Sequence, residues 1–156
     1  MAFGTFDIFH EGHQNFLNQA KQLGNNLIVI IARDRTTTNV KGEAPLHNES
    51  VRLNSVKASC IANKVILGNH DDKYKVIKKH RPNVIALGYD QMIFTQQLNK
   101  VLIDLKLDAE IVRLDAYFPQ VFKSSLIKRR NAEEGVENTA VHTATSTMTQ
   151  SNVTIN

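Results

Sequence analysis

Two histidines three residues apart stand near the start of the chain, in the segment Gly4-Thr5-Phe6-Asp7-Ile8-Phe9-His10-Glu11-Gly12-His13. If a helix begins near them, this spacing lets both imidazoles face one pocket. Two imidazoles aimed at one phosphate donate hydrogen bonds to its non-bridging oxygens as charge builds up during displacement. We therefore interpret His10 and His13 as a candidate pair for stabilising such a transition state, a role that requires no covalent bond to the protein.

Two glycines frame the histidines. Gly4 allows the chain to turn where a strand ends. Gly12 removes a side chain where a ligand would meet the helix N-terminus, whose free N–H groups and dipole favour anions such as phosphate. A zinc pair is the alternative interpretation of the histidines, but no third Cys, His or acid lies nearby at ligand spacing.

Short apolar runs alternate with amphipathic stretches along the chain. Four runs have the composition of buried parallel strands: Leu27–Ala32, Val65–Leu67, Val84–Leu87 and Ile111–Leu114. Only Met1-Ala2-Phe3 precedes Gly4, so the first strand is either unusually short or continues upstream of Met1. Helices are predicted from about His13 to Leu23, from about Glu49 to Ala62, before Pro82, over Phe94–Leu105 and from near Ser124. Cys60 is spaced with Leu53 and Val56 and is predicted to be in the core.

The alternation predicts an α/β fold with a single doubly wound, mostly parallel sheet. Ligands of such sheets bind beyond the carboxyl ends of the strands. The candidate loops are Gly4–Gly12, Arg33–Asn48, Gly68–Lys73, Gly88–Ile93 and Asp115–Lys123. After Arg130 the apolar pattern ends and the chain becomes rich in Thr, Ser and Asn. We predict one domain over residues 1–130 and a disordered tail over residues 131–156.

Charge is unevenly distributed along the chain. All 19 Lys and Arg side chains lie within residues 1–130, and three of the 15 acids follow Arg130, so the body carries +7 and the tail −3. The absence of a basic cluster interleaved with aromatics favours phosphorylated small molecules over nucleic acid as partners. The single cysteine, the absence of a membrane-length apolar run and the absence of a leader pattern predict a cytoplasmic protein without a membrane span.

The segment from Gly4 to His13 resembles the Gly-Thr-Phe-Asp-x-x-His-x-Gly-His signature of the cytidylyltransferase-type nucleotidyltransferases. The later segments most resemble the archaeal-type FAD synthases: Ala32–Thr36, Lys41–Pro45, Glu49 with Arg52 and Leu53, Leu67–Asn69 and Val84–Gln91. This resemblance spans about residues 1–130 and implies a Rossmann-like nucleotidyltransferase fold. It also implies transfer of AMP from ATP to FMN, giving FAD and pyrophosphate, a divalent metal such as Mg²⁺ on the triphosphate, and a homodimer.

The resemblance implies site residues as well. Thr5 and Phe6 would contact the nucleotide, the segment His10, Glu11, Gly12 and His13 would surround its phosphates, and Asp90 and Tyr117 would complete the ATP site. Lys41, on the loop after the second strand, matches a lysine that neutralises the α-phosphate region; a solvated lysine is the alternative. Ser124 and Ser125 match a pair near the β- and γ-phosphates; N-capping explains them almost as well. Arg113 and Lys123 either pair with phosphate or are solvated, and no residue is assigned as a metal ligand.

Two positions depart from the family pattern. Glu11 stands where the family has proline, which puts an acid near the expected triphosphate unless the side chain points outward. Asn63 replaces an acid before the third strand. Glu11 and the short first strand leave a non-catalytic nucleotide-binding relative as one alternative function. Because acceptor choice depends on pocket shape, a cytidylyltransferase acting on a small phosphorylated alcohol such as glycerol 3-phosphate is the other.

Overall fold

The computed structural model describes residues 1–72 and 74–133. Its framework is a parallel sheet with the strand order β3-β2-β1-β4-β5. The strands are β1 (Ala2–Gly4), β2 (Ile28–Ile31), β3 (Lys64–Leu67), β4 (Val84–Leu87) and β5 (Glu110–Arg113). The helices are α1 (Glu11–Gln22), α2 (Asp34–Lys41), α3 (Glu49–Ala58), α4 (Lys75–His80) and α5 (Met92–Asp104), and residues 124–133 are also helical. The predicted doubly wound α/β fold is confirmed.

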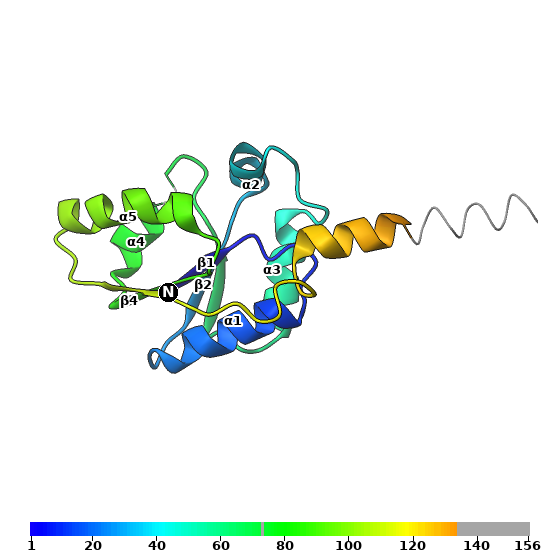
Figure 1. The fold of residues 1–156 in the computed structure, drawn as a ribbon. Coiled ribbons are helices and arrows are strands. Elements are labelled where there is room, and N and C mark those ends of the chain that lie inside the picture. Colours follow the sequence, from blue (N-terminus) through cyan, green and yellow to red (C-terminus); the bar gives the residue numbers. More distant parts are fainter. Residues whose placement is uncertain (73, 134–156) are drawn as a thin grey trace, which may run out of the picture.

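Helices cover both faces of this sheet, with α4 and α5 above it and α1 below it in Figure 1. Adjacent residues of a strand point to opposite faces. Accordingly, Val29 and Ile31 of β2 join the core under α1 and α3, whereas Ile30 joins the core under α4 and α5. The buried apolar residues that the helices add to this core are Leu17, Ala20 and Val56 on the first face and Val76, Ile77, Leu98 and Leu102 on the second. Because both faces are covered, β2 and β4 are apolar throughout, whereas the edge strands β3 and β5 carry charged residues only at their ends.

The central strand β1 marks the point where the strand order reverses. It pairs with β2 through all of its residues and with β4 through Ala2, opposite Ala86. The backbone carbonyl of Met1 accepts a further hydrogen bond from Ala86 N at 2.8 Å. A crevice at the carboxyl end of such a switch point is the usual ligand position in open α/β sheets.

Two local predictions are wrong. The segment Arg33–Asn48 is not a loop throughout, because it contains α2, and Lys41 is the last residue of that helix. Cys60 is exposed and not in the core. The physical reason is that α3 ends at Ala58 and the backbone of Cys60 turns into the left-handed region, with φ of 55°.

The described helix at 124–133 continues past the predicted domain boundary at residue 130. The rest of the predicted tail, residues 134–156, lies outside the described residues, so the division into domain and tail stays a prediction. None of the helices in the described part of the chain has both the length and the apolar character that crossing a bilayer requires.

Candidate active site

A cavity of about 510 Å³ opens at the carboxyl ends of the strands. Its walls include residues that follow each strand in turn: Thr5, Ala32, Gly68, Gly88 and Asp115. The helix α2 and the helix at 124–133 supply further wall residues, which include Lys41 and Ser124. The volume lies within the range of roughly 300–1,000 Å³ typical of small-molecule sites.

His10 and His13 lie face to face in this cavity. Their ring centroids are 3.8 Å apart and their planes differ by 18°. His10 is the residue before α1, and its backbone carbonyl accepts a hydrogen bond from His13 N at 2.9 Å, so the first helical turn sets the spacing. In both rings Nδ1 is buried and has no hydrogen-bond partner among residues 1–72 and 74–133. Nε2 is therefore the nitrogen through which each ring reaches a ligand.

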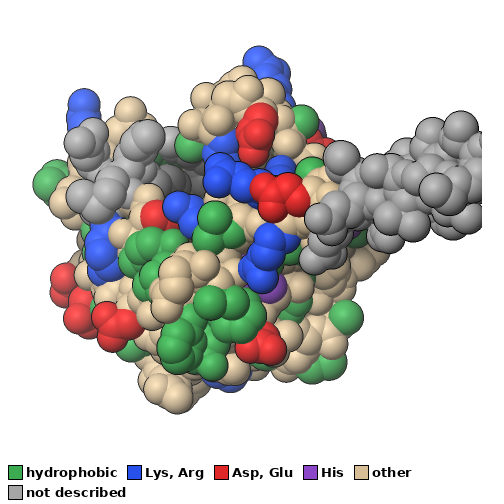
Figure 2. Space-filling model, turned by 45° about the vertical axis from the view of Figure 1, so that its right-hand side comes forward, with side chains coloured by type: hydrophobic (Ala, Val, Ile, Leu, Met, Phe, Trp, Pro, Cys, Tyr) green, Lys and Arg blue, Asp and Glu red, His purple; other side chains and the backbone are tan. Residues whose placement is uncertain are grey.

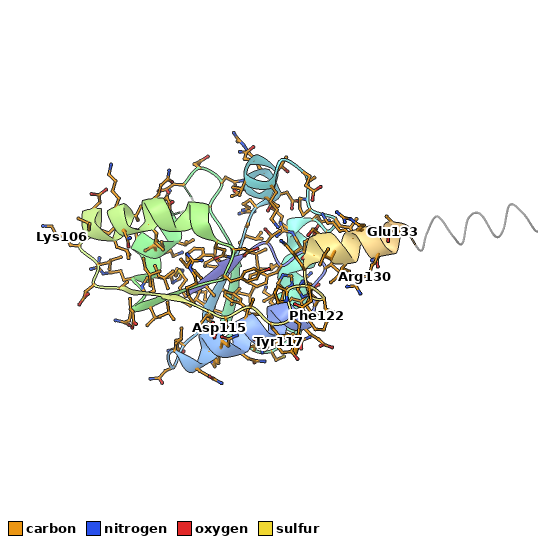
Figure 3. The ribbon with its side chains drawn as sticks, in the orientation of Figure 1. Lys106, Asp115, Tyr117, Phe122, Arg130 and Glu133 are labelled. Carbon is orange, nitrogen blue, oxygen red and sulfur yellow. The ribbon has the colours of Figure 1, made fainter. Side chains whose placement is uncertain are left out.

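Aromatic rings pack around the histidine pair. Phe9 stacks with His13 at 5.8 Å between centroids, and Phe6 meets His13 edge-on at 5.3 Å. On the side of His10, Phe122 lies nearly parallel to the imidazole at 6.3 Å. Tyr117 stacks on Phe122 at 5.6 Å. Figure 3 shows Phe122 between the N-terminal end of α1 and the helix at 124–133.

This packing changes the electrostatics of both imidazoles. Burial lowers the pKa of His10 below its ordinary value. Burial, followed by the nearby His10 and Lys41, lowers the pKa of His13 to about 3, against a smaller opposite effect of Asp7. Both rings are therefore neutral at physiological pH, and each carries one N–H donor and one lone pair.

Two glycines make room for the side chains of His10 and Phe6. A Cβ atom on Gly12 would lie 3.0 Å from Cε1 of His10 and 3.0 Å from Cβ of Phe122. A Cβ atom on Gly4 would lie 2.6 Å from Cε2 of Phe6. The residues of this segment with positive φ are Phe6 (55°) and Ile8 (50°), so Gly4 permits close approach of the Phe6 ring and does not supply a left-handed turn.

Asp7 joins three parts of the cavity wall. Its buried carboxylate accepts hydrogen bonds from Leu46 N (2.8 Å) and His47 N (3.0 Å) and lies 3.1 Å from Nζ of Lys128. Burial alone would raise the pKa of Asp7, but these hydrogen bonds and the lysine charge outweigh it and lower the pKa. Asp7 thus stays ionised. It connects the segment Gly4–His13, called the signature segment below, to the chain between α2 and α3 and to the helix at 124–133.

The buried Arg52 side chain bridges the segments that follow β1 and β2. The residue is 1% exposed, and its side chain donates to the carbonyls of Thr5 (2.5 Å), Ala32 (2.7 Å) and His47 (2.9 Å). It also pairs with Asp34 at 2.8 Å. The carbonyls of Thr5 and Ala32 follow β1 and β2, so this buried guanidinium fixes the ends of both strands where they form the cavity.

Three lysines line the cavity. Lys128 is paired with Asp7 and lies 3.6 Å from Glu43. Lys41 and Lys123 are exposed, and within the described part of the chain their side chains form no hydrogen bond or ion pair. Arg113 does not line the cavity and donates to the Gly88 carbonyl at 2.8 Å. Lys41 and Lys123 are thus the lysines of this cavity available to an anionic ligand.

Most of the predicted contact residues lie together. Thr5, Phe6, His10, Gly12, His13, Lys41, Asp90, Tyr117, Ser124 and Ser125 all line the cavity. Glu11 does not: it is exposed and borders a neighbouring hollow with Gln14 and Arg130, on the other side of His10 and Phe122, which line both. Asn63 lies at the opposite end of the sheet, where its Oδ1 accepts from Leu27 N at 2.9 Å. Neither departure from the family pattern therefore places a side chain in the cavity.

The structure adds two residues to which the sequence analysis assigns no role. Lys128 follows Ser124 by four residues and so shares its helix face, a spacing that could have suggested it. Phe122 packs against His10, but its sequence neighbourhood gives no comparable signal. Both come from a part of the chain more than 100 residues away from the histidines.

The described residues contain no group of three or more His, Cys, Asp or Glu side chains that could hold a metal ion. His10 and His13 have no third ligand of this kind there. On the face seen in Figure 2, Lys and Arg side chains are interspersed with acids and border an apolar patch, without forming one continuous basic surface.

Residues 1–130 match the family model described as Cytidylyltransferase-like. The chain is 39% identical over 133 residues to the FAD synthase of Picrophilus torridus, covering 85% of this chain and 95% of that protein. It is 46% identical over 114 residues to the FAD synthase of Methanosarcina mazei, covering 73% and 74%. The crystal structure of the lipopolysaccharide core biosynthesis protein from Thermoplasma volcanium superposes with a TM-score of 0.70 at 37% identity, covering 75% of this chain and 95% of that one.

Proposed function

The chain belongs to the cytidylyltransferase-like family and, within it, to the FAD synthases, and from this premise we propose how its cavity performs the reaction. An FAD synthase is an FMN adenylyltransferase: the phosphate of FMN attacks the α-phosphorus of ATP, and pyrophosphate leaves. One P–O bond forms and another breaks, so the protein has to align the two substrates and stabilise charge on the phosphoryl oxygens.

The observation that carries the catalytic proposal is the stacked, neutral pair formed by His10 and His13. Each ring has its Nδ1 buried, which leaves Nε2 as the donor toward the non-bridging oxygens of the α-phosphate. Such donors strengthen as charge develops, and each one is worth about 10²–10³ in kcat in a preorganised site. Neither ring has to lose or gain a proton during the step.

Cationic and backbone groups complete the proposed phosphate site. Lys41 reaches the cavity from the C-terminal end of α2 and would balance the charge of the α-phosphate region. Gly12 lies in the first turn of α1, before the helical hydrogen bonds that begin with His13 N, so its N–H has no acceptor within the helix and favours an anion. Ser124 and Ser125 would contact the departing pyrophosphate, Ser124 through its backbone N–H, because its hydroxyl donates to the Asp7 carbonyl, and Ser125 through its hydroxyl.

The remaining predicted contacts are proposed for the nucleotide and its cation. Thr5, Phe6, Asp90 and Tyr117 would hold the ATP from the part of the cavity formed by the segments that follow β1, β4 and β5. Glu11 lies outside this cavity, so we leave it out of the contacts. A divalent cation, most simply Mg²⁺, would arrive on the triphosphate as part of the substrate. Cytoplasmic location and a homodimer stay predictions from the sequence.

A substrate panel tests the proposed reaction. Purified protein with FMN, ATP and Mg²⁺ should yield FAD and pyrophosphate in equal amounts, while CTP with glycerol 3-phosphate should not react. Reaction of the second pair alone would make the protein a cytidylyltransferase for a phosphorylated alcohol. Binding of ATP without turnover of any acceptor would instead support a non-catalytic relative.

Histidine variants test the catalytic pair. His10→Ala and His13→Ala should each lower kcat by about 10²–10³ with much smaller changes in KM. His70→Ala is the matched control, because His70 is exposed and does not line the cavity. Retention of more than about a third of wild-type kcat in either cavity variant would contradict the role given to that ring.

A further inference from the structure

The hydroxyl of Ser124 lies between the signature segment and His10. Ser124 is the first residue of the helix at 124–133 and is half-buried. Its Oγ donates a hydrogen bond to the backbone carbonyl of Asp7 at 2.7 Å and lies 3.4 Å from Nε2 of His10. Ser124 thus contacts both Asp7 and His10, each of which lies more than 110 residues before it in the sequence.

The donor and acceptor roles at this junction follow from hydrogen-bond chemistry. A carbonyl oxygen only accepts, and a serine hydroxyl has one hydrogen to donate. The short contact with the Asp7 carbonyl therefore uses the Ser124 proton. The Oγ atom can then only accept from His10, which requires Nε2 of the neutral ring to carry the hydrogen.

We propose that Ser124 is a positioning residue that holds His10 in the tautomer with its proton on Nε2, an inference that rests on the proposed function. The other tautomer would have two defects. It would turn the Nε2 lone pair toward the Oγ lone pairs of Ser124, and it would bury an N–H group at Nδ1, which has no acceptor within the described residues.

The aromatic rings stacked around His10 hold its imidazole in this orientation. His13 at 3.8 Å and Phe122 at 6.3 Å lie nearly parallel to the ring, and the backbone of Gly12 lies so close to its edge that a Cβ atom there would be 3.0 Å from Cε1 of His10. A ring flip, which would exchange the two nitrogens, has to open this packing. Ser124 therefore selects the proton position, and the aromatic stack holds the ring plane.

The tautomer decides whether His10 donates to the phosphate or repels it. With the proton on Nε2, the ring presents an N–H to the cavity and can share it between Ser124 and a phosphoryl oxygen. With the proton on Nδ1, the ring presents a lone pair to an anionic oxygen. In serine proteases the wrong tautomer of a catalytic histidine lowers kcat by about 10⁴, so even a partial shift is measurable.

Nuclear magnetic resonance of ¹⁵N-labelled, ligand-free protein tests the proposal. Two-bond proton–nitrogen correlations of the imidazole distinguish the tautomers, and comparison with a His10→Gln variant assigns the signals. At pH 8, wild-type His10 should show Nε2–H. Ser124→Ala should raise the ratio of Nδ1–H to Nε2–H about five- to tenfold, the size expected for one lost neutral hydrogen bond.

Kinetics of the same proteins complete the test. Ser124→Ala should lower kcat about five- to tenfold and change the KM for ATP by less than about twofold. Ser124→Thr, which retains a hydroxyl, should keep the wild-type tautomer ratio and most of kcat. Ser125→Ala should leave the His10 signals unchanged, because the serine hydroxyl beside Nε2 of that ring is the one of Ser124.

Three results would overturn the proposal: an unchanged tautomer ratio in Ser124→Ala, a changed ratio without a fall in kcat, or an equal change in Ser125→Ala. A thermal melt of each variant identifies any that fails to fold, and Ser124→Thr then carries the test. Failure of the proposed function is separable, because it appears as absence of FAD from the wild type and leaves the ligand-free spectra untouched.

Discussion

Replacing Asp7 by asparagine removes a charge that holds three segments together while changing the side-chain volume very little. The wild-type carboxylate accepts from Leu46 N and His47 N and lies 3.1 Å from Nζ of Lys128. Asparagine keeps one carbonyl acceptor and presents an NH₂ group in place of the other oxygen. One backbone N–H therefore loses its acceptor, and Lys128 loses its closest counter-charge.

The cost of Asp7→Asn follows from these contacts. A hydrogen bond to a charged group contributes about 1.5–3 kcal/mol, and an N–H left without an acceptor costs about 1–3 kcal/mol. The Lys128 side chain is 25% exposed and can turn toward water or Glu43, which keeps its share small. We expect the free energy of unfolding to fall by about 3 kcal/mol, or the Tm by roughly 10 °C.

Urea unfolding at several pH values provides the assay. The pKa of Asp7 is lower in the folded protein than in the unfolded chain. Its stabilising contribution is therefore complete above the unfolded pKa of about 3.9 and disappears as the pH falls through that value toward the folded pKa. The difference in stability between wild type and Asp7→Asn should be full at pH 7 and should shrink between about pH 5 and pH 3.

Glu43→Gln is the matched control, since it changes an acid at the other side of Lys128 that is 67% exposed. Surface pairs of this kind contribute at most about 1 kcal/mol, so the control should change stability far less. A loss below about 1 kcal/mol for Asp7→Asn, an equal loss for Glu43→Gln, or a difference independent of pH would refute the reasoning.

Three more variants probe the packing and charge around the histidines. Gly12→Ala puts a methyl group 3.0 Å from Phe122 and His10 and should cost about 1–3 kcal/mol in urea unfolding, whereas Gly24→Ala, with nothing within 4 Å, should change stability by under about 0.5 kcal/mol; equal effects would contradict this packing. His13, with a pKa of about 3 when folded, takes up a proton near pH 6.5 only when unfolded, so the wild type should lose stability from pH 7 to pH 4 and His13→Gln should lose less; parallel curves would show ordinary titration. Lys41→Met should lower kcat/KM for ATP about 10- to 100-fold while the urea midpoint stays nearly unchanged, and an unaltered kcat/KM would place Lys41 outside the phosphate site.

The sheet and the position of the cavity could be predicted because their signals are local. Runs such as Val84–Leu87 are apolar on both faces, which is typical of a buried parallel strand, and the structure has β4 over the same residues. The helix α1 follows from the spacing of Leu17 and Ala20. Once the alternation of strands and helices is known, the carboxyl edge of the sheet follows from topology.

The helix α2 could not be predicted from its own sequence. Its three threonines, its asparagine and its valine are poor helix formers. It is stabilised from outside, because Asp34 N donates to Oε2 of Glu49 at 2.9 Å and Arg52 pairs with the Asp34 carboxylate. The local signal that remained was Gly42, which ends α2 in the left-handed conformation with φ of 78°.

The wall contacts of the candidate site were hidden for the same reason. The spacing of His10 and His13 indicates a shared pocket, but nothing in the sequence indicates that Asp7 accepts from the backbone of Leu46 and His47. Likewise, Glu11 reads as an acid beside the phosphates, and only the direction of its side chain at the start of α1 removes it from the cavity. Sequence gives the residue types, whereas tertiary contacts decide which atoms meet.

The segment Gly4–His13 gives up stability at several positions close to the histidine pair. Phe6 and Ile8 hold positive φ, a state that costs about 1–3 kcal/mol each in residues of this kind. His10 occupies the N-cap of α1 but makes no capping hydrogen bond with its side chain, where a serine or aspartate would add about 1 kcal/mol. Two neighbouring residues of the segment offset these costs: the ring of Phe6 is buried, and the carboxylate of Asp7 contacts Leu46 N, His47 N and Lys128. A serine or aspartate at position 10 would stabilise α1 but would leave the cavity without the imidazole that stacks on His13. The presence of histidine at this position therefore explains both the uncapped start of α1 and the histidine pair of the proposed phosphate site.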